Sequence, residues 1–309
     1  MPSNTAVSPK NKKTLVMLII SVVFVILVGV IIFLCVQLNR SETKPKALVP
    51  CLDSGRCLVG VSFSDNIPGF RVKNGKEYFG FDVDMANYLS QRLGRDAPLF
   101  VQADRDQSLA DPGKPVHMYI STVSMTDERR ERMLFVGPYM RTFQGMMVTN
   151  DSQIRTRDDL ASKAVCAAEG TTSYEALRAY SRTHPVDVKD EATVEQCIQG
   201  LKSGRYDAVT GDYITLQTHA HADTALLPLP EIRISDGYEL YGVALPKDSM
   251  ALCQKLKPIL KDFIREKWEP AFQANLKDLG ITYDLTNTSI PSLKPGESIV
   301  DTNSCKAKG

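Results

Sequence analysis

Apolar and polar positions along this 309-residue chain follow the periodicity of helices in some segments and of strands in others. Residues 80–94, GFDVDMANYLSQRLG, carry an apolar side chain at every fourth position from Phe81 to Leu93. This spacing predicts a helix with one buried face. Two aspartates near its start and Gly94 after its last apolar residue are typical of helix ends. Both boundaries of this helix are therefore predicted.

Strand-like segments precede other predicted helices. Residues 116–120, VHMYI, are short and mostly apolar, which predicts a buried strand just before the polar stretch STVSMTDERRER. Another apolar strand precedes a Gly-Thr-Thr loop and a helix from about Tyr174, and a third ends near Thr210, before a helix that Asp212 opens. Strands that alternate with helices predict an α/β fold with mostly parallel sheets.

The C-terminal part of the chain changes character twice. Residues 253–281 form an amphipathic helical region that Pro258 and Pro270 are expected to interrupt or bend. From residue 284 onward the chain is polar and contains two further prolines, so we expect an extended tail.

One N-terminal segment departs from the globular pattern. Residues 15–36 are a run of 22 positions without a charge, enough to cross a bilayer core of about 30 Å as a helix. A signal peptide would have a shorter apolar core and a small-residue cleavage site, which the end of this run, FLCVQLNR, lacks. We therefore expect an uncleaved anchor that leaves the larger part of the chain outside the cell. A lipid on Cys35 is the alternative.

The cysteines agree with an extracytoplasmic location. Apart from Cys35 they all lie on the C-terminal side of the anchor, and their even number suits an oxidising compartment. Cys166 lies in a predicted strand and Cys197 in a predicted helix of the same region, so we expect these two to form a disulfide. For the other four we suggest, by elimination, the pairs Cys51–Cys57 and Cys253–Cys305. The sequence alone leaves other connectivities open.

Charge and motifs exclude several classes of function. The chain has 37 basic and 36 acidic residues, a net charge of +1, which gives no electrostatic footprint for nucleic acid. It contains no GxSxG, GxxxxGK[ST] or HExxH motif, so nothing in it supports an enzyme by itself. The HAH stretch at residues 219–221 with Asp223 fits the polar end of an exposed helix better than a metal site. We expect no metal and no cofactor.

Three predicted strand-to-helix junctions carry polar groups, at residues 121–126, 169–173 and 211–212. Helix N-termini offer unpaired N–H groups to an anion, and open α/β sheets bind ligands at the carboxyl ends of their strands. Arg129 could add a bidentate clamp for a carboxylate, and Asp212 could receive an ammonium group. Together they would suit the zwitterion of a free α-amino acid.

The opening turn of the helix around Arg129 can be predicted in more detail. Thr126 is a suitable N-cap, and two acidic residues follow it in the first turn, where the helix dipole favours them. Arg129 would then emerge toward the ligand, whereas Arg130 and Arg132 are expected to face water. The alternative is that the whole stretch is a solvated helix face.

Four motifs, in order, carry a resemblance to a known family. GFDVDMANYLSQRLG, ISTVSMTDERRERMLFVGPY, EGTTS and GRYDAVTGDY resemble the extracytoplasmic polar-amino-acid-binding proteins of ABC importers, and the glutamate/glutamine binders among them most. The similarity covers roughly residues 55–283. It implies a two-lobed periplasmic-binding-protein fold of type II with two hinge crossings, near RTFQGMMVT and YELYGVALP.

The resemblance also implies roles for individual residues. Arg129 would hold the α-carboxylate of the ligand, and Ser124 would add a hydroxyl. Thr172, at a helix N-terminus of the other lobe, would close on the same carboxylate. The backbone at Thr122 and the carboxylate of Asp212 would meet the α-ammonium.

The ligand side chain would meet a second group of residues. Residues from Phe63 to Asp65 would place an aromatic or polar group over the ligand. Arg105 lies where glutamate-type members often carry an arginine for the side chain.

The predicted organisation places these residues in an ordered series of segments. They are a cytoplasmic tail (1–14), an anchor (15–36), a linker (37–54), lobe one (55–143 and 242–283), lobe two (148–237) and an extended tail (284–309). The expected protein is a monomer tethered to the cell membrane by a single pass, with its binding domain extracytoplasmic. It would capture a free L-amino acid and deliver it to an ABC importer permease without catalysing a reaction.

Two alternatives stay open at this stage. The same fold can sense a ligand and signal through a membrane partner. It can also be an enzyme, as in the resembling cyclohexadienyl dehydratases, which turnover of prephenate or arogenate would reveal.

Overall fold

The computed structural model describes residues 26–30, 51–52, 55–62, 69, 71–73, 77–103, 109, 116–279 and 294–306. The chain divides into two units, Met1–Leu48 and Val49–Gly309. In the first unit, residues 26–30 are helical and exposed. Within the described residues no helix is both long enough and apolar enough to span a membrane. The rest of the anchor expected at residues 15–36 lies outside the described residues.

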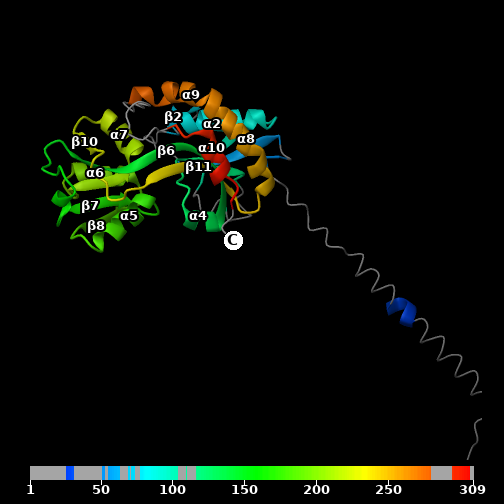
Figure 1. Ribbon diagram of the computed structural model, residues 1–309, viewed down its shortest axis with the longest axis horizontal. Coiled ribbons are helices and arrows are strands. Elements are labelled where there is room, and N and C mark those ends of the chain that lie inside the picture. The colour runs from blue at the N-terminus through cyan, green and yellow to red at the C-terminus, as the bar shows by residue number, and fades with distance from the viewer. Residues whose placement is uncertain are drawn as a thin grey trace, which may run out of the picture. The chain divides into compact units, whose positions relative to one another are not determined.

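The second unit is built on a 9-stranded mixed sheet whose strands run in the order β4-β1-β5-β11-β6-β9-β7-β8, with β10 paired to β6 (Figure 1). β1 pairs in parallel with β4 and β5, and β7 pairs in parallel with β8 and β9. The strands of the first lobe are β1 (Arg56–Val61), β4 (Asp96–Gln102), β5 (Met118–Tyr119) and β11 (Tyr238–Pro246). Those of the second lobe are β7 (Ala164–Ala168), β8 (Asp187–Glu191), β9 (Ala208–Asp212) and β10 (Leu226–Leu229). A separate hairpin joins β2 (Arg71–Lys73) and β3 (Glu77–Phe79).

One strand, β6 (Met133–Thr149), belongs to both lobes. Over its first part it pairs with β11, and from Gln144 onward with β9 and β10, always antiparallel. Both of the crossings expected as hinges are therefore strands, β6 and β11, that run side by side, with an irregularity in their register between Tyr241 and Val243 (Figure 1).

The helices of the first lobe cover its part of the sheet. They are α2 (Phe81–Arg92), α4 (Asp127–Arg132), α8 (Met250–Glu266), α9 (Trp268–Asn275), the 3-10 turn η2 (Lys277–Leu279) and α10 (Glu297–Asn303). The helix predicted at residues 80–94 is present as α2. Gly94 follows it with φ of +71°, a left-handed conformation that glycine adopts without strain.

The second lobe has the 3-10 turn η1 (Asp158–Leu160), α5 (Thr172–Ser181), α6 (Val194–Lys202) and α7 (Tyr213–Ala222). α6 begins with a capping box, in which the Thr193 hydroxyl accepts from the Gln196 amide and the Gln196 side chain accepts from the Thr193 amide. Its buried face, which includes Ile198 and Leu201, then packs beside β7 and β9.

Each lobe has its own hydrophobic core. The core of the first lobe gathers the inner faces of β1 and β6 with α2, α8 and α9, and Trp268 at its centre donates its indole N–H to the Tyr139 carbonyl, 2.7 Å away. The second lobe has two smaller clusters, one on each side of β7 and β9. Separate cores allow each lobe to keep its shape if the two lobes move.

Three disulfides are present, and they are the pairs expected from the sequence. They join Cys51 to Cys57, Cys166 to Cys197, and Cys253 to Cys305. The first includes a residue of the expected linker, so the folded body already contains Cys51, which is fully buried.

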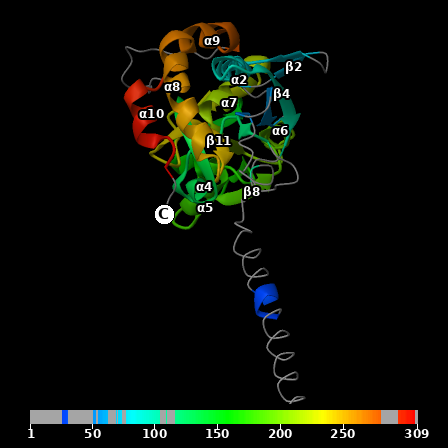
Figure 2. The same ribbon diagram turned by 90° about the vertical axis from the view of Figure 1, so that its right-hand side faces the viewer.

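The C-terminal part corrects two expectations. α8 continues through Pro258 and ends at Glu266, so the helical region is interrupted at Lys267, not at either proline. The tail expected to be extended contains α10, which lies beside α8 (Figure 2). Its helical periodicity is too weak to read in the sequence because Val300 is its one buried residue.

Candidate functional site

The helix that carries Arg129 starts where the sequence predicted. β5 ends at Tyr119, and α4 begins after a short loop with Thr126 as its N-cap. The Thr126 hydroxyl accepts a hydrogen bond from the Arg129 amide at 3.2 Å. This cap fixes the first turn of α4, from which the Arg129 side chain extends.

The Arg129 guanidinium is buried and reaches the other lobe. Its Nη1 donates to the Ser124 carbonyl at 2.9 Å, and its Nη2 donates to the Gly170 carbonyl at 3.3 Å. Gly170 belongs to the EGTTS loop of the second lobe, so the two lobes meet at this side chain. The side chain is only 8% exposed, which excludes a solvated helix face.

The other two arginines of α4 differ from each other. Arg132 is exposed and pairs with Glu128 at 3.3 Å, as expected for a solvated position. Arg130 was expected to face water, but this was wrong, because its guanidinium is buried over the Phe135 ring and donates to the Asn303 carbonyl. The C-terminal segment covers Arg130, a contact that the sequence did not predict although the suggested Cys253–Cys305 pair brings this segment to α8.

The second half of the site is Asp212, at the carboxyl end of β9. It occupies the N-cap position of α7, yet its side chain makes no capping hydrogen bond. Oδ2 accepts from the Tyr241 hydroxyl, while the buried Oδ1 has no hydrogen-bond partner among the described residues. A buried acceptor in this state is suited to a donor supplied by a ligand.

The pKa of Asp212 also suits a positively charged ligand group. Burial, followed by the nearby Glu239 carboxylate, raises the pKa of the Asp212 carboxyl to about 7, against the opposing effects of Tyr241 and Arg129. The charged form of this carboxylate therefore lacks sufficient positive charge around it. A ligand ammonium would supply that charge.

Thr122 lies at the carboxyl end of β5 with an unusual backbone. Its φ is +49°, which is uncommon for a residue with a branched side chain, and its amide donates to Asp82 Oδ2 at 3.3 Å. Burial raises the pKa of the Asp82 carboxyl to about 6, although the Tyr139 hydroxyl and the Thr122 amide lower it. Since the Thr122 amide is engaged with Asp82, its carbonyl is the backbone group that remains for a ligand.

Ser124 and the EGTTS loop complete the groups expected near the carboxylate. Ser124 is buried and forms an isolated β-bridge with Tyr241, and its carbonyl holds Arg129. In the loop, Thr171 is the N-cap of α5 and accepts from the Tyr174 amide at 3.1 Å. Thr172 is the first residue of α5, where amides have no partner within the helix.

Two further residues were not predicted as part of the site. Gln144 and Glu239 face Asp212 from the hinge strands β6 and β11, where Gln144 is the register partner of Asp212. The Gln144 side chain donates to Glu239 Oε1 at 3.0 Å and accepts from the Ser235 hydroxyl at 3.2 Å. The signal in the sequence was weak, because a polar pair within two hinge strands has no motif.

Several expected site residues are not placed by the structure. Phe63, Asp65 and Arg105, expected around the ligand side chain, lie outside the described residues. Where the structure does describe the chain, it contains no group of three or more His, Cys, Asp and Glu side chains that could hold a metal ion. His219, expected at the polar end of an exposed helix, is buried in the second lobe. Its Nε2 lies 3.8 Å from Glu195 Oε1.

Comparison with known proteins identifies the family to which the chain belongs. Residues 59–269 match the family of bacterial extracellular solute-binding proteins, family 3. The glutamine-binding protein of Geobacillus stearothermophilus is 26% identical over 209 residues, which cover 65% of this chain and 77% of the relative. The L-cystine-binding protein TcyJ of Escherichia coli (strain K12) is 32% identical over 165 residues, covering 52% of this chain and 60% of the relative.

The solved structures extend the likeness to the fold. The crystal structure of the substrate-binding protein of an amino acid ABC transporter aligns with a TM-score of 0.64 and 26% identity, over 72% of this chain and 100% of that one. This chain belongs to the family 3 bacterial extracellular solute-binding proteins and has their two-lobed α/β periplasmic-binding-protein fold.

Proposed function

We propose that this protein captures a free L-amino acid between its two lobes and delivers it to an ABC importer. The observation that carries the proposal is the pairing of an arginine with an aspartate whose Oδ1 is enclosed and has no hydrogen-bond partner among the described residues, at the contact between the lobes. Arg129 extends from the first lobe and Asp212 lies in the second, and Arg129 lowers the pKa of the Asp212 carboxyl. A zwitterion satisfies both groups at once.

The α-carboxylate of the ligand would bind the Arg129 fork and the amide of Thr172 at the start of α5, with the Ser124 hydroxyl beside them. Charge-assisted and bidentate hydrogen bonds of this kind are stronger than neutral ones. The positive end of the α5 dipole favours the same anion.

The α-ammonium would bind Asp212 Oδ1 and the Thr122 carbonyl. Asp212 Oδ1 has no other hydrogen-bond partner among the residues with described positions, and the Asp82 carboxylate holds the Thr122 backbone in place. These contacts involve both lobes, so a bound ligand would favour the closed arrangement.

The side chain of the ligand would be glutamate- or glutamine-like. We assign its recognition to Phe63, Asp65 and Arg105, and the resemblance to glutamate and glutamine binders supports this assignment. Two relatives are named for glutamine and cystine, which keeps polar amino acids as the ligand class to test.

The moving parts would be lobe one (residues 55–143 and 242–283) and lobe two (148–237), with β6 and β11 as the hinge. Two strands that cross side by side can bend or twist without breaking their ladder of hydrogen bonds. The apolar clusters support this division, because Ile214 of α7 is the one residue of 148–237 in the cluster of the first lobe among the described residues.

The protein would work as a monomer anchored in the cell membrane by residues 15–36, with the body outside the cell and an importer permease as partner. The length and apolar composition of this segment support the anchor. Mass spectrometry of the membrane-extracted protein tests it, since a mature N-terminus beyond residue 36 or a lipid on Cys35 would contradict it.

A thermal-shift screen of the purified protein against the common L-amino acids and L-cystine tests the binding function. A ligand at a hundred times its Kd should stabilise the folded state by about 2.7 kcal/mol. If none of the amino acids raises the melting temperature, the proposed function is wrong.

A further inference from the structure

A short segment near the C-terminus lies on the hinge strand. Residues 303–305, named here the C-terminal strap, comprise the last residue of α10 and the two residues after it, and they lie against the first part of β6. The Ser304 hydroxyl accepts from the Gly137 amide at 3.0 Å and donates to the Gly137 carbonyl at 3.2 Å. The Cys305 amide donates to the Phe135 carbonyl at 2.8 Å. Side-chain and backbone groups of the strap thus pair with β6 as an additional edge segment would.

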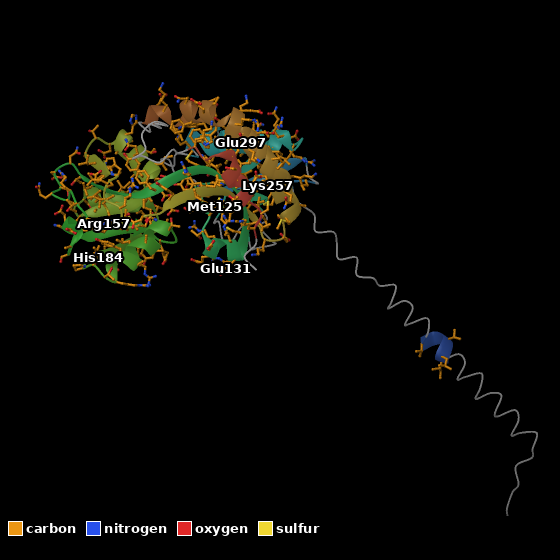
Figure 3. All side chains as sticks on the ribbon, in the orientation of Figure 1. Met125, Glu131, Arg157, His184, Lys257 and Glu297 are labelled. Atoms are coloured by element: carbon orange, nitrogen blue, oxygen red, sulfur yellow. A yellow bond between two sulfur atoms is a disulfide. The ribbon has the colours of Figure 1, made fainter. Side chains whose placement is uncertain are left out.

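The strap is fastened to the first lobe at both ends. The disulfide between Cys253 and Cys305 joins its last residue to α8. At the other end α10 carries ion pairs to α8, which are Asp301 with Lys257 and Lys261, and Glu297 with Arg265. Lys257 and Glu297 lie on the same side of the lobe (Figure 3). The covalent link is the strongest of these fastenings, because the exposed ion pairs contribute little each.

The strap also holds the helix that carries the ligand clamp. The Arg130 guanidinium donates to the Asn303 carbonyl at 2.8 Å and lies 5.6 Å from the centroid of the Phe135 ring. Lys247 donates to the carbonyls of Arg130 and Glu131 at 2.9 Å, at the end of the same helix. α4 has only six residues, and helices this short depend on tertiary contacts for their stability.

We propose that the C-terminal strap positions Arg129. Arg130 is the positioning residue, because it links the strap to α4, and the Cys253–Cys305 disulfide attaches the strap to α8. The inference rests on the proposed function, in which Arg129 binds the ligand carboxylate. Arg129 and Arg130 are neighbours in one helical turn, so a displacement of Arg130 moves the backbone from which Arg129 extends. The bidentate clamp then loses its alignment with both Gly170 and the ligand.

Hydrogen–deuterium exchange of the full chain without ligand tests whether the strap stabilises α4. In the double variant Cys253→Ser/Cys305→Ser, amides of residues 127–137 should exchange about ten times faster than in the wild type, because opening of α4 becomes easier. The matched control is Cys166→Ser/Cys197→Ser, which removes the disulfide of the second lobe and should leave residues 127–137 unchanged. Faster exchange confined to residues 294–306 would overturn the proposal.

Ligand titration tests the consequence for the clamp, with L-glutamine, L-glutamate, L-arginine and L-cystine each tested separately. Arg130→Ala should weaken binding about tenfold, as expected when a charged clamp is misplaced and not removed. Arg132→Ala, on the same helix, should bind like the wild type, and Arg130→Lys should recover part of the loss. Equal affinities for Arg130→Ala and Arg132→Ala would overturn the proposal.

A double-mutant cycle separates positioning from general loss of stability. In an Arg129→Lys background, Arg130→Ala should cost much less affinity, whereas its cost should be unchanged in an Asp212→Asn background. Equal costs in both backgrounds would mean that Arg130 does not act through Arg129. If the wild type binds none of the amino acids, the proposed function fails, and the exchange measurement still decides whether the strap holds α4.

Discussion

Arg129 is buried and Asp212 is half-buried with its Oδ1 enclosed, both at the contact between the lobes, but their surroundings differ in kind. Arg129 already has backbone partners from each lobe, and its helix is fixed by Thr126, Lys247 and the C-terminal segment. Asp212 has one tyrosine hydroxyl and a second oxygen with no partner in the described part of the chain. The end of the site proposed to bind the ligand carboxylate is therefore already fixed by packing, whereas the end proposed to bind the ammonium has a carboxylate oxygen without a partner among the described residues.

This difference affects the ionisation of Asp212 in the second lobe. A carboxyl group whose pKa is raised to about 7 is only partly ionised at neutral pH in the protein without ligand. In the first lobe, by contrast, two carbonyl oxygens already accept hydrogen bonds from the Arg129 guanidinium. Four predictions test or refine this contrast, from the largest expected effect to the smallest.

Loss of the arginine should have the largest effect. Arg129→Ala removes a bidentate, charge-assisted pair, so ligand binding should weaken by at least about a hundredfold. Calorimetry with the ligand found in the screen measures this loss. The matched control is Arg132→Ala, one turn away and exposed, which should change affinity little. Similar affinities for the two variants would contradict a clamp at Arg129.

Loss of charge at Asp212 should weaken binding nearly as much. Asp212→Asn keeps the shape of the side chain but removes the partner of the ammonium, and we expect a loss of about a hundredfold. Because the asparagine amide is neutral, the variant has no carboxylate charge to bury, and without ligand it should be at least as stable as the wild type. Denaturant unfolding checks the second point. A variant that binds normally would show that the ammonium lies elsewhere.

The affinity of the wild type should depend on pH in the range set by Asp212. The ammonium needs the carboxylate, so affinity should fall about tenfold for each pH unit below 7. Stability without ligand should change in the opposite direction. A folded pKa above the unfolded value means that the folded state binds the extra proton, so stability is lost as pH rises from about 4 to about 7.

Asp82, whose pKa is raised to about 6, contributes to stability with the same sign. Unfolding and titration series at several pH values measure the two trends, and Asp212→Asn is the control that should remove the change in affinity. An affinity that is constant between pH 5 and pH 8 would show that Asp212 is already ionised in the free protein.

Glu239 should have the smallest effect of the four. Its carboxylate raises the pKa of Asp212, so Glu239→Gln should lower that pKa and move the pH dependence of binding to lower values. At pH 7 the affinity should change only a few-fold, since Glu239 affects the ligand through the pKa of Asp212. The glutamine that replaces it keeps a side-chain oxygen that can accept from Gln144. Glu231→Gln, at an exposed position, is the control. An unchanged pH profile would exclude this influence.

The sequence predicted the parts of the site that depend on local structure. Thr126 as a cap, Gly94 after α2 and Asp212 at the end of β9 all follow from signals within a few residues. The Cys166–Cys197 disulfide joins a strand and a helix that compact packing brings together, and the other two pairs follow by elimination.

The rest depends on long-range contacts that no local signal encodes. Arg130 is buried by a segment more than 170 residues later, at Asn303, and that segment shows one buried residue in its helix. Gln144 and Glu239 meet because β6 and β11 pair in a register that only the folded sheet fixes. Pro258 is expected from the sequence to interrupt or bend the helical region, yet α8, with its buried face packed on the sheet, continues through it to Glu266.

The single strand shared by both lobes has a consequence for how the gene can change. Successive side chains of a strand point to opposite faces, so deleting one codon in the middle of β6 would invert every position after it. Both faces of this part of β6 are buried, with Met146 and Val148 in one apolar cluster and Met147 in the other, so the deletion would exchange side chains between two differently shaped cores, while the first lobe would remain intact. Insertions and deletions should therefore be tolerated in the loops but not within these 17 residues, whose length fixes which face of the sheet each side chain occupies in both halves of the protein.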